Sequence, residues 1–321
     1  MQVWYLGIDV AKAKFDCALR QPDGKHKHKV FDNNPSGFES LSRWLLDYGV
    51  TNLHACMEAT GVYWESVAEY LANQGHVVSV VNPFQIKAFG ASRLVRTKTD
   101  KVDAKLIAEF CKENQPEAWK APSAQEQALR AMVLRLDALQ EMRQQESNRL
   151  AVAREVVREE ITSHIQWLDN EIKNLAKKIR NSIDDDPDLR QRKALLESIP
   201  GVGERTISML LAFSLTPERF RSARQVTAYV GLDPRQHESG SSVRGRPQIS
   251  RFGHSVVRKL MYMPAMYTLY RTIWGRQFLE RLSRNGKKPM TMIVAMMRKL
   301  LHVAFGVLKS GEKFKPTLHL A

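Results

Sequence analysis

Residues 3–33, VWYLGIDVAKAKFDCALRQPDGKHKHKVFDN, decide the fold of the amino-terminal part of the chain. The stretch holds three strand-like runs, VWYLGIDVA, FDCALRQ and HKHKVFDN, and a tight bend joins the first two. Runs of β-branched and aromatic residues that are bounded by turn-forming residues are typical of strands. The sequence therefore predicts that three strands precede the first helix.

Strand and helix patterns alternate over the rest of residues 1–122. Helical patterns occupy residues 34–49, 62–75 and 98–113, and strand-like runs occupy residues 52–59 and 76–83. Such alternation predicts an α/β sheet domain. Three leading strands favour a ribonuclease-H-like order over a Rossmann order, and the lack of GxGxxG after the first strand argues against a dinucleotide site.

Residues 123–188 are predicted to form a coiled-coil arm. Residues 123–186 contain neither Gly nor Pro, and apolar residues repeat in them at the heptad spacing that is typical of coiled coils. The two seams are Leu129, Met132, Leu136, Leu139 and Ile161, Ile165, Leu168, Ile172, Leu175, Ile179. A weaker pattern near Arg143 and Glu146 indicates a break or an antiparallel turn. The arm is therefore either a hairpin within one chain or a dimerisation element.

Charge distinguishes the last predicted domain, residues 189–321. The chain has a net charge of +15, and residues 191–321 hold 23 Lys and Arg against 7 Asp and Glu. A basic domain of this kind predicts a nucleic-acid partner. The three cysteines are far apart, and the chain has no secretory signal and no uncharged run of about 20 residues. These features predict a protein of the reducing cytoplasm without a membrane partner.

A helix-hairpin-helix pattern opens the basic domain. LLESIPGVGERTISMLLAF, residues 195–213, contains two helical stretches joined by IPGVG. A glycine-rich turn at a helix amino terminus can offer backbone N–H groups to a DNA phosphate without reading sequence. Gly201 and Gly203 are therefore candidate nucleic-acid contacts, although the same pattern also forms plain turns between core helices. Lys287 and Lys288 are further candidate contacts in this domain.

Carboxylates of the amino-terminal domain form a candidate metal site. Asp9 and Glu58 each follow an apolar strand, and Asp100 and Asp103 are three residues apart at the start of a helix, so they share one face. Mg²⁺ prefers carboxylate oxygens, and two such ions can hold both oxygens of a phosphoryl displacement. Each residue also has a structural explanation; for example, Asp9 could be a turn residue and Asp100 a helix cap.

Motifs along nearly the whole chain resemble those of the insertion-sequence 110 transposases, a family of Piv-like recombinases. GIDVAKAKFD, MEATGVYW and KTDKVDAKLIAEF resemble the DEDD motifs of that family. IPGVGERTISMLLA, FRSARQVTAYVGLDP, ESGSSVRGRPQISRFGH and VRKLMYMPA resemble its carboxyl-terminal transposase domain. The resemblance implies a RuvC-like amino-terminal domain in which Asp9, Glu58, Asp100 and Asp103 bind Mg²⁺ or Mn²⁺.

The resemblance also implies a serine nucleophile in the polar stretch RQHESGSSVRGRPQISRFGHS, residues 235–255. The family serine precedes a glycine and corresponds to Ser239, with Ser241 as the alternative; it would attack a DNA phosphate and stay joined to the strand. A serine hydroxyl needs activation, by a bound metal ion or by one of the two candidate bases in the stretch, His237 and Glu238. Arginines of the stretch would pair with phosphate oxygens through their forked guanidinium groups: Arg244, Arg246 and Arg251.

The same resemblance implies the partners. They are donor DNA, target DNA and a structured non-coding bridge RNA that supplies sequence choice by base pairing. The working form would be a homo-oligomer, from dimer to tetramer, in the bacterial cytoplasm at the nucleoid. Other hypotheses are a metal-only RuvC-like nuclease similar to Holliday-junction resolvases, a non-catalytic nucleic-acid-binding protein, and a sugar-kinase-like ATPase, whose further phosphate-binding glycine motifs are missing.

Overall fold

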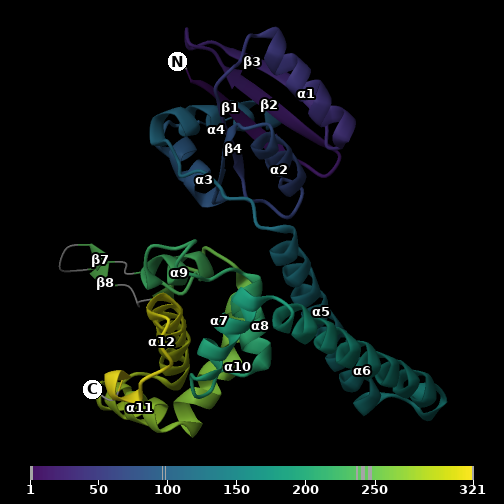
Figure 1. Ribbon diagram of the computed structural model, residues 1–321, viewed down its shortest axis with the longest axis vertical. Helices are drawn as coiled ribbons and strands as arrows, with labels where there is room; N and C mark the ends of the chain where they lie inside the picture. The colour runs from purple at the N-terminus through teal and green to yellow at the C-terminus, as the bar shows by residue number, and fades with distance from the viewer. Residues whose placement is uncertain are drawn as a thin grey trace. The chain divides into compact units, whose positions relative to one another are not determined.

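The computed structural model describes residues 3–319 except 96, 98, 236, 237, 240–242 and 245–247. The chain divides into two compact units, Met1–Ala121 and Pro122–Ala321, referred to as unit 1 and unit 2. Figure 1 shows their elements in chain order. The finer division at residues 122 and 188 stays a prediction.

Unit 1 is built on a mixed sheet whose described strands follow the order β3-β2-β1-β4-β5. The strands are β1 (Trp4–Val10), β2 (Lys14–Arg20), β3 (His26–Asp32), β4 (Leu53–Glu58) and β5 (Val77–Val81). β1, β2 and β3 are antiparallel neighbours, whereas β4 runs parallel to β1 and β5 runs parallel to β4. The prediction of an α/β domain with three strands before the first helix is confirmed.

Helices cover both faces of this sheet: α1 (Pro35–Asp47), α2 (Glu65–Asn73), α3 (Pro83–Ser92) and α4 (Asp100–Asn114). Leu6 of β1 belongs to a core that includes Leu41 of α1 and Leu71 of α2. Cys56 of β4 belongs to a second core, with Ile107 of α4. The sequence analysis did not predict α3, because PFQIKAFGAS distributes its apolar residues around the helix rather than along one face.

The contact between α4 and β1 depends on Gly7. A Cβ atom at this position would lie 2.0 Å from the carbonyl oxygen of Ala104 and 2.3 Å from the backbone nitrogen of Ala108. The side-chain amide of Gln115, which follows α4, donates a hydrogen bond of 2.8 Å to the Tyr5 hydroxyl. The end of α4 therefore lies near the start of β1, and its first turn lies toward the carboxyl end of that strand.

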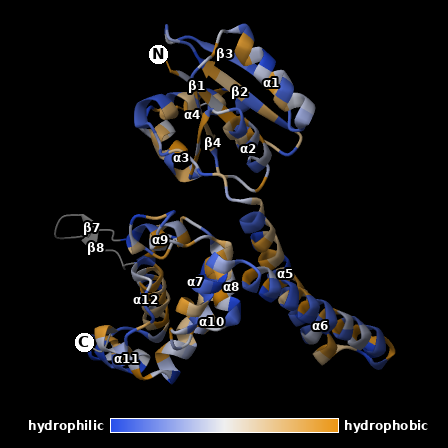
Figure 2. Ribbon diagram, in the orientation of Figure 1, coloured by the Kyte–Doolittle hydropathy of each residue, from blue (hydrophilic) through white to orange (hydrophobic). Residues whose placement is uncertain are grey.

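The arm of unit 2 is a helical hairpin within one chain. α5 (Ala124–Val152) and α6 (Glu155–Asp184) are joined by Ala153 and Arg154 and pack against each other in antiparallel directions. Figure 2 shows that most of their surface is hydrophilic. Of the predicted alternatives, a break or an antiparallel turn near Arg143 and Glu146, the antiparallel turn is present but lies at Ala153 and Arg154, because α5 continues through both predicted residues. The Glu146 carboxylate accepts a hydrogen bond from Arg149. Association between chains through this arm stays a prediction.

The remainder of unit 2 is mostly helical: α7 (Pro187–Glu197), α8 (Glu204–Ala212), α9 (Ala223–Val230), α10 (Ser255–Arg271), α11 (Ile273–Arg284) and α12 (Pro289–Ser310). By length and composition alone, α12 could cross a membrane, but 56% of its apolar window is buried inside the unit. Met296 and Leu300 of α12 are almost fully buried in the main core of unit 2. α12 is therefore a core helix of this unit (Figure 2).

His254 is a half-buried titratable group at the start of α10. Its ring lies 4.5 Å from the ring centroid of Tyr229 and 5.6 Å from that of Phe213. Burial lowers the pKa of His254 to about 4, and the positive charges of nearby arginines add to the effect. The folded unit therefore favours the neutral imidazole.

Replacement of Gly7 by Ala should destabilise unit 1 by at least about 2 kcal/mol, because backbone atoms of α4 must move to admit the new methyl group. Urea unfolding of the full chain measures the change. Gly306→Ala in α12 is the matched control: an added Cβ meets nothing within 4 Å there, and the helix should gain about 0.5–1 kcal/mol. Equal stability of Gly7→Ala and wild type would contradict the packing described.

Unit 2 should lose stability as the pH falls from about 6.5 toward 4, because the unfolded chain then binds a proton at residue 254 that the folded chain does not bind. The expected loss between pH 7 and pH 5 is roughly 2 kcal/mol. Urea unfolding of wild type and His254→Gln at both pH values measures the difference between them. A pH dependence that is identical in the two proteins would rule out this role for His254.

Candidate active site

Asp9 of β1 and Glu58 of β4 lie side by side at the carboxyl ends of parallel strands. The register pairs Ile8 with Met57, so the next positions along the two strands are Asp9 and Glu58. Both residues are half-buried. The sheet therefore brings these two predicted site residues together.

Both carboxylates lie on the face of the sheet that α4 covers. Side chains alternate between the two faces along a strand. Gly7, two residues before Asp9, contacts α4, and Cys56, two residues before Glu58, packs with Ile107 of α4. Asp9 and Glu58 therefore project toward the same helical layer.

α4 adds Asp100 and Asp103 from its first turn. The amino-terminal cap is Thr99, whose hydroxyl accepts a hydrogen bond of 3.3 Å from the backbone N–H of Val102. Capping therefore does not explain Asp100. Because α4 is antiparallel to β1, its first turn approaches the strand end that carries Asp9.

Asp16 of β2 is a further carboxylate on this face, and the sequence analysis did not identify it. It is paired with Asp9 across the two strands and is only 4% exposed. Its Oδ1 lies 2.8 Å from Nε2 of His28. Its Oδ2 accepts a hydrogen bond of 3.3 Å from Nζ of Lys14, which also donates one of 3.0 Å to Oδ2 of Asp100. The signal that could have revealed Asp16 is a charged residue inside the apolar run FDCAL.

Lys14 affects the electrostatics of this group directly. Its hydrogen bond and its charge lower the pKa of the Asp100 carboxyl. Lys14 therefore stabilises the ionised form of one carboxylate at the edge of the cluster.

The donor chemistry of this cluster fits a divalent cation. All four predicted ligands are carboxylates, which Mg²⁺ prefers, and the backbone brings them to one region of one face. In the arrangement observed, however, no three or more His, Cys, Asp or Glu side chains of the described residues are placed to hold a metal ion. Lys14 contacts Asp100 instead. The backbone positions of the four carboxylate residues therefore fit a metal site, whereas their side chains are not arranged as ligands of one ion.

The polar stretch with the candidate serines forms short antiparallel pairs in unit 2. β6 (Pro234–Arg235) pairs with β9 (Gln248–Ile249), and β7 (Glu238–Ser239) pairs with β8 (Val243–Arg244), with Ser239 opposite Val243. The described part of Ser239 and Arg244 is their backbone. Three residues named in the sequence analysis lie outside the described residues: His237, Ser241 and Arg246.

Close backbone packing fixes residues 251–253, which lie near the end of this polar stretch. A Cβ atom on Gly253 would lie 2.3 Å from the carbonyl oxygen of Tyr229. The N–H of Arg251 donates a hydrogen bond of 3.2 Å to the carbonyl of Gly231. Arg251 is exposed and has a φ of 58°, which costs energy in a residue with a side chain. The predicted phosphate contact Arg251 is therefore held on a rigid backbone and faces solvent.

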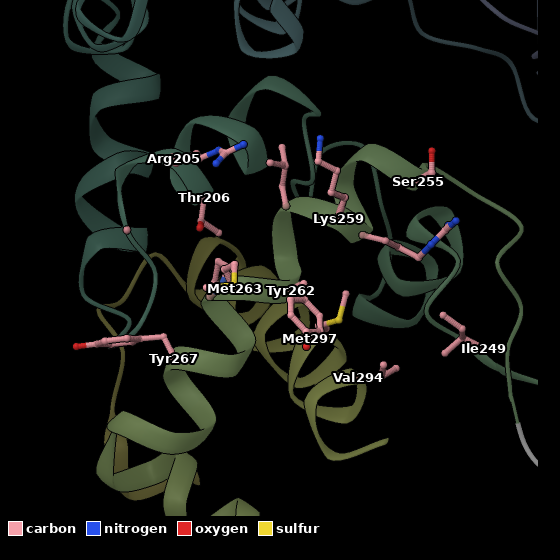
Figure 3. Close-up of a pocket in the computed structure, with 14 residues that line it drawn as sticks. Arg205, Thr206, Ile249, Ser255, Lys259, Tyr262, Met263, Tyr267, Val294 and Met297 are labelled. Carbon is pink, nitrogen blue, oxygen red and sulfur yellow. The ribbon is translucent and has the colours of Figure 1, made fainter. Parts of the chain in front are cut away.

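A groove of about 900 Å³ lies next to β9. Its lining includes Ile249 of β9, Arg205 of α8, and Lys259, Tyr262 and Tyr267 of α10. Figure 3 shows Arg205 and Lys259 in the upper part of the groove and Tyr262 and Tyr267 below them. The groove thus combines cationic and aromatic side chains, which suit phosphates and bases respectively.

Asp137 of α5 is buried and pairs with two of the three cationic residues that line the groove. Its Oδ1 is 2.9 Å from Nη2 of Arg205, and its Oδ2 is 2.7 Å from Nζ of Lys259. One carboxylate therefore joins the arm to α8 and α10.

The predicted glycine contacts differ in their surroundings. A Cβ atom on Gly201 would lie 1.9 Å from Oγ1 of Thr268, and the residue has a φ of +98°. Packing against α10 therefore explains Gly201. Gly203 is exposed at the amino terminus of α8, lines the groove, and has nothing within 4 Å of an added Cβ. Lys287 and Lys288 are exposed between α11 and α12.

Comparisons with known proteins agree along the whole chain. Residues 6–153 match the model of DEDD transposases of IS110 type, described as "Transposase", and residues 193–281 match the model "Transposase IS116/IS110/IS902 family". The pilin gene-inverting proteins of Moraxella bovis and Moraxella lacunata are each 33% identical over 331 residues, covering 99% of this chain and 100% of the relative. The transposase of insertion element IS1328 from Yersinia enterocolitica is 25% identical over 97% of this chain and 98% of its own length. The chain belongs to the IS110 family of transposases and recombinases.

Proposed function

We propose that this transposase cuts and rejoins DNA strands through a covalent phosphoserine–DNA intermediate, with Mg²⁺ held by the four DEDD carboxylates. The observation that supports the metal part of the proposal is that β1 and β4 end side by side at Asp9 and Glu58, and that α4, which covers that face of the sheet, carries Asp100 and Asp103 in its first turn. This arrangement follows from strand register and helix direction, and it uses residues that are distant in sequence.

A RuvC-like, ribonuclease-H-like fold of unit 1 is part of the proposal. The strand order β3-β2-β1-β4-β5, with the first three strands antiparallel and β4 parallel to β1, supports it. The position of the carboxylates at the ends of the two central strands also supports it.

Asp9, Glu58, Asp100 and Asp103 would hold Mg²⁺, or Mn²⁺ in its place. A bound ion would polarise the scissile phosphate and stabilise the leaving oxygen. The sheet fixes the backbone of Asp9 and Glu58, and α4 fixes that of Asp100 and Asp103, so the protein determines the spacing of the ligands before any ion binds.

Ser239 is the proposed nucleophile. Its hydroxyl oxygen would form a bond to phosphorus, the bridging P–O bond would break, and one DNA strand end would leave as a hydroxyl after receiving a proton. The phosphodiester energy is kept in the serine linkage, so the reverse attack can rejoin a strand without ATP. The serine–glycine pair at residues 239 and 240, in the stretch that resembles the family's transposase domain, supports the assignment.

Unit 2 is the proposed nucleic-acid-binding unit, with donor DNA, target DNA and a structured bridge RNA as its ligands. Its support is the charge of residues 191–321, the exposed Arg251, and the groove that holds Arg205 and Tyr267. The turn between α7 and α8 would act as a helix-hairpin-helix-like phosphate contact through Gly203. We further propose a homo-oligomer, dimer to tetramer, at the nucleoid of a bacterial cytoplasm.

Two alternatives also have support: a particular product of strand exchange, and a different mechanism of cleavage. The full-length similarity to pilin gene-inverting proteins favours inversion of a DNA segment as a product of strand exchange. The carboxylate cluster alone would fit a metal-only, structure-selective nuclease without a serine nucleophile. The serine mechanism and the metal-only mechanism differ in whether the protein becomes joined to DNA.

Ser239→Ala should abolish both recombination and the protein–DNA adduct, because no other group of the proposed mechanism can form the phosphodiester with DNA. Purified protein, bridge RNA, substrate DNA and Mg²⁺ are incubated, and a denaturing gel separates the adduct. Ser241→Ala is the matched control and should keep the adduct. Strand cleavage that persists in Ser239→Ala would favour the metal-only nuclease instead.

Asp9→Asn should lower strand cleavage by at least roughly a hundredfold, because a neutral amide is a poor ligand for a divalent ion. Binding of DNA should remain within about twofold of wild type, since residue 9 is not part of the basic unit. Cleavage rates and gel-shift titrations measure the two effects. Asp47→Asn, on an exposed position of α1, is the control. Full cleavage by Asp9→Asn would overturn the metal assignment.

A further inference from the structure

We propose that Lys14 is a built-in counter-ion of the carboxylate cluster and that binding of a divalent cation displaces its ammonium group from Asp100. The inference rests on the proposed metal site and adds to its four carboxylates a residue of opposite charge. It explains why the four carboxylates are suitable ligands for a metal ion although their side chains are not arranged around one: Lys14 is paired with Asp100 instead.

The geometry places Lys14 between two elements of the cluster. Its Nζ lies 3.0 Å from Oδ2 of Asp100 on α4 and 3.3 Å from Oδ2 of Asp16 on β2. Asp16 is paired with Asp9 in the neighbouring strand, so the ammonium is one strand away from a proposed ligand. One positive charge thus joins the helix to the sheet at the carboxylate site.

Electrostatics explain why the cluster needs such a charge. Carboxylates that share a small region repel one another and resist ionisation unless a cation is close. Asp16 is nearly buried, and its other oxygen lies 2.8 Å from His28. Lys14 therefore neutralises part of the cluster while no metal ion is bound.

Exposure makes the pair reversible. The side chains of Lys14 and Asp100 are 48% and 59% exposed, respectively. An ammonium group on a flexible four-carbon stem can move into water at low cost, and an exposed ion pair adds little stability. A divalent cation bound to Asp100 would repel the ammonium group, so the two cations compete for the same carboxylate.

Lys14→Met should therefore bind Mn²⁺ roughly threefold to tenfold more tightly than wild type, as expected for loss of one or two partly exposed ion pairs. Titration calorimetry or Mn²⁺ paramagnetic resonance of the full chain gives the dissociation constants. Lys12→Met removes the same charge from an exposed position of the same turn and should change the constant by less than about twofold at physiological salt. Equal tightening in both variants would mean a general charge effect and would overturn the role of Lys14.

A second measurement uses the wild-type chain and does not depend on folding of a variant. Acylation of lysines, read by mass spectrometry, should label Lys14 severalfold faster when Mg²⁺ is added, with the rate at Lys12 unchanged. No change at Lys14 with a metal ion bound would overturn the displacement. If neither wild type nor Lys14→Met binds Mn²⁺, the proposed metal site itself fails. If both bind it equally well, only the role of Lys14 fails.

Discussion

The close contact between α4 and the backbone of β1 at Gly7 is the constraint on which the candidate active site depends. A helix backbone can lie this near to a strand only where no Cβ atom intervenes, and Ala104 and Ala108 are the helix residues that use the space. The contact fixes the position of α4 along the strand. A shift by one turn would move Asp100 by about 5.4 Å relative to Asp9, which is more than twice a metal–oxygen distance. A residue without a side chain therefore sets the spacing of the carboxylates.

In unit 2 the arm is held to the basic helices by ion pairs of one carboxylate, Asp137. The helices of this unit carry an excess of positive charge, and like charges on one compact unit repel each other. Asp137 is a nearly buried carboxylate that holds Arg205 and Lys259 from two different helices. Loss of Asp137 would remove this partner from Arg205 and would leave Lys259 paired with Glu141. The arm is therefore bound to the basic helices by charge as well as by apolar packing.

Apolar patterns in the sequence were sufficient to predict the strands of the unit 1 sheet and the helices α1, α2, α4, α5, α6, α7 and α8. The helices α9, α10 and α11 were not predicted. α3 was missed because its apolar residues surround the helix. The break or antiparallel turn of the arm was predicted near Arg143 and Glu146, where the heptad pattern weakens, whereas the turn lies at Ala153 and Arg154. Asp9 and Glu58 could be predicted because they end apolar runs, whereas Asp16 lies inside one. The Lys14–Asp100 pair joins residues 86 positions apart. No local pattern encodes such a pair; it follows only from the way α4 lies on the sheet.

The distribution of charge connects these features to the proposed chemistry. Residues 1–121 hold 15 Lys and Arg against 14 Asp and Glu, so the unit with the carboxylates gives DNA little general attraction. A phosphate near Asp9, Asp16 and Glu58 meets like charges at short range, where repulsion is strong and screening is weak. One ammonium group offsets part of that repulsion, whereas a divalent ion offsets more and adds an attraction to the phosphate. Under the proposed function, exchange of Lys14 for a metal ion would thus turn a site that repels the DNA backbone into one that accepts it.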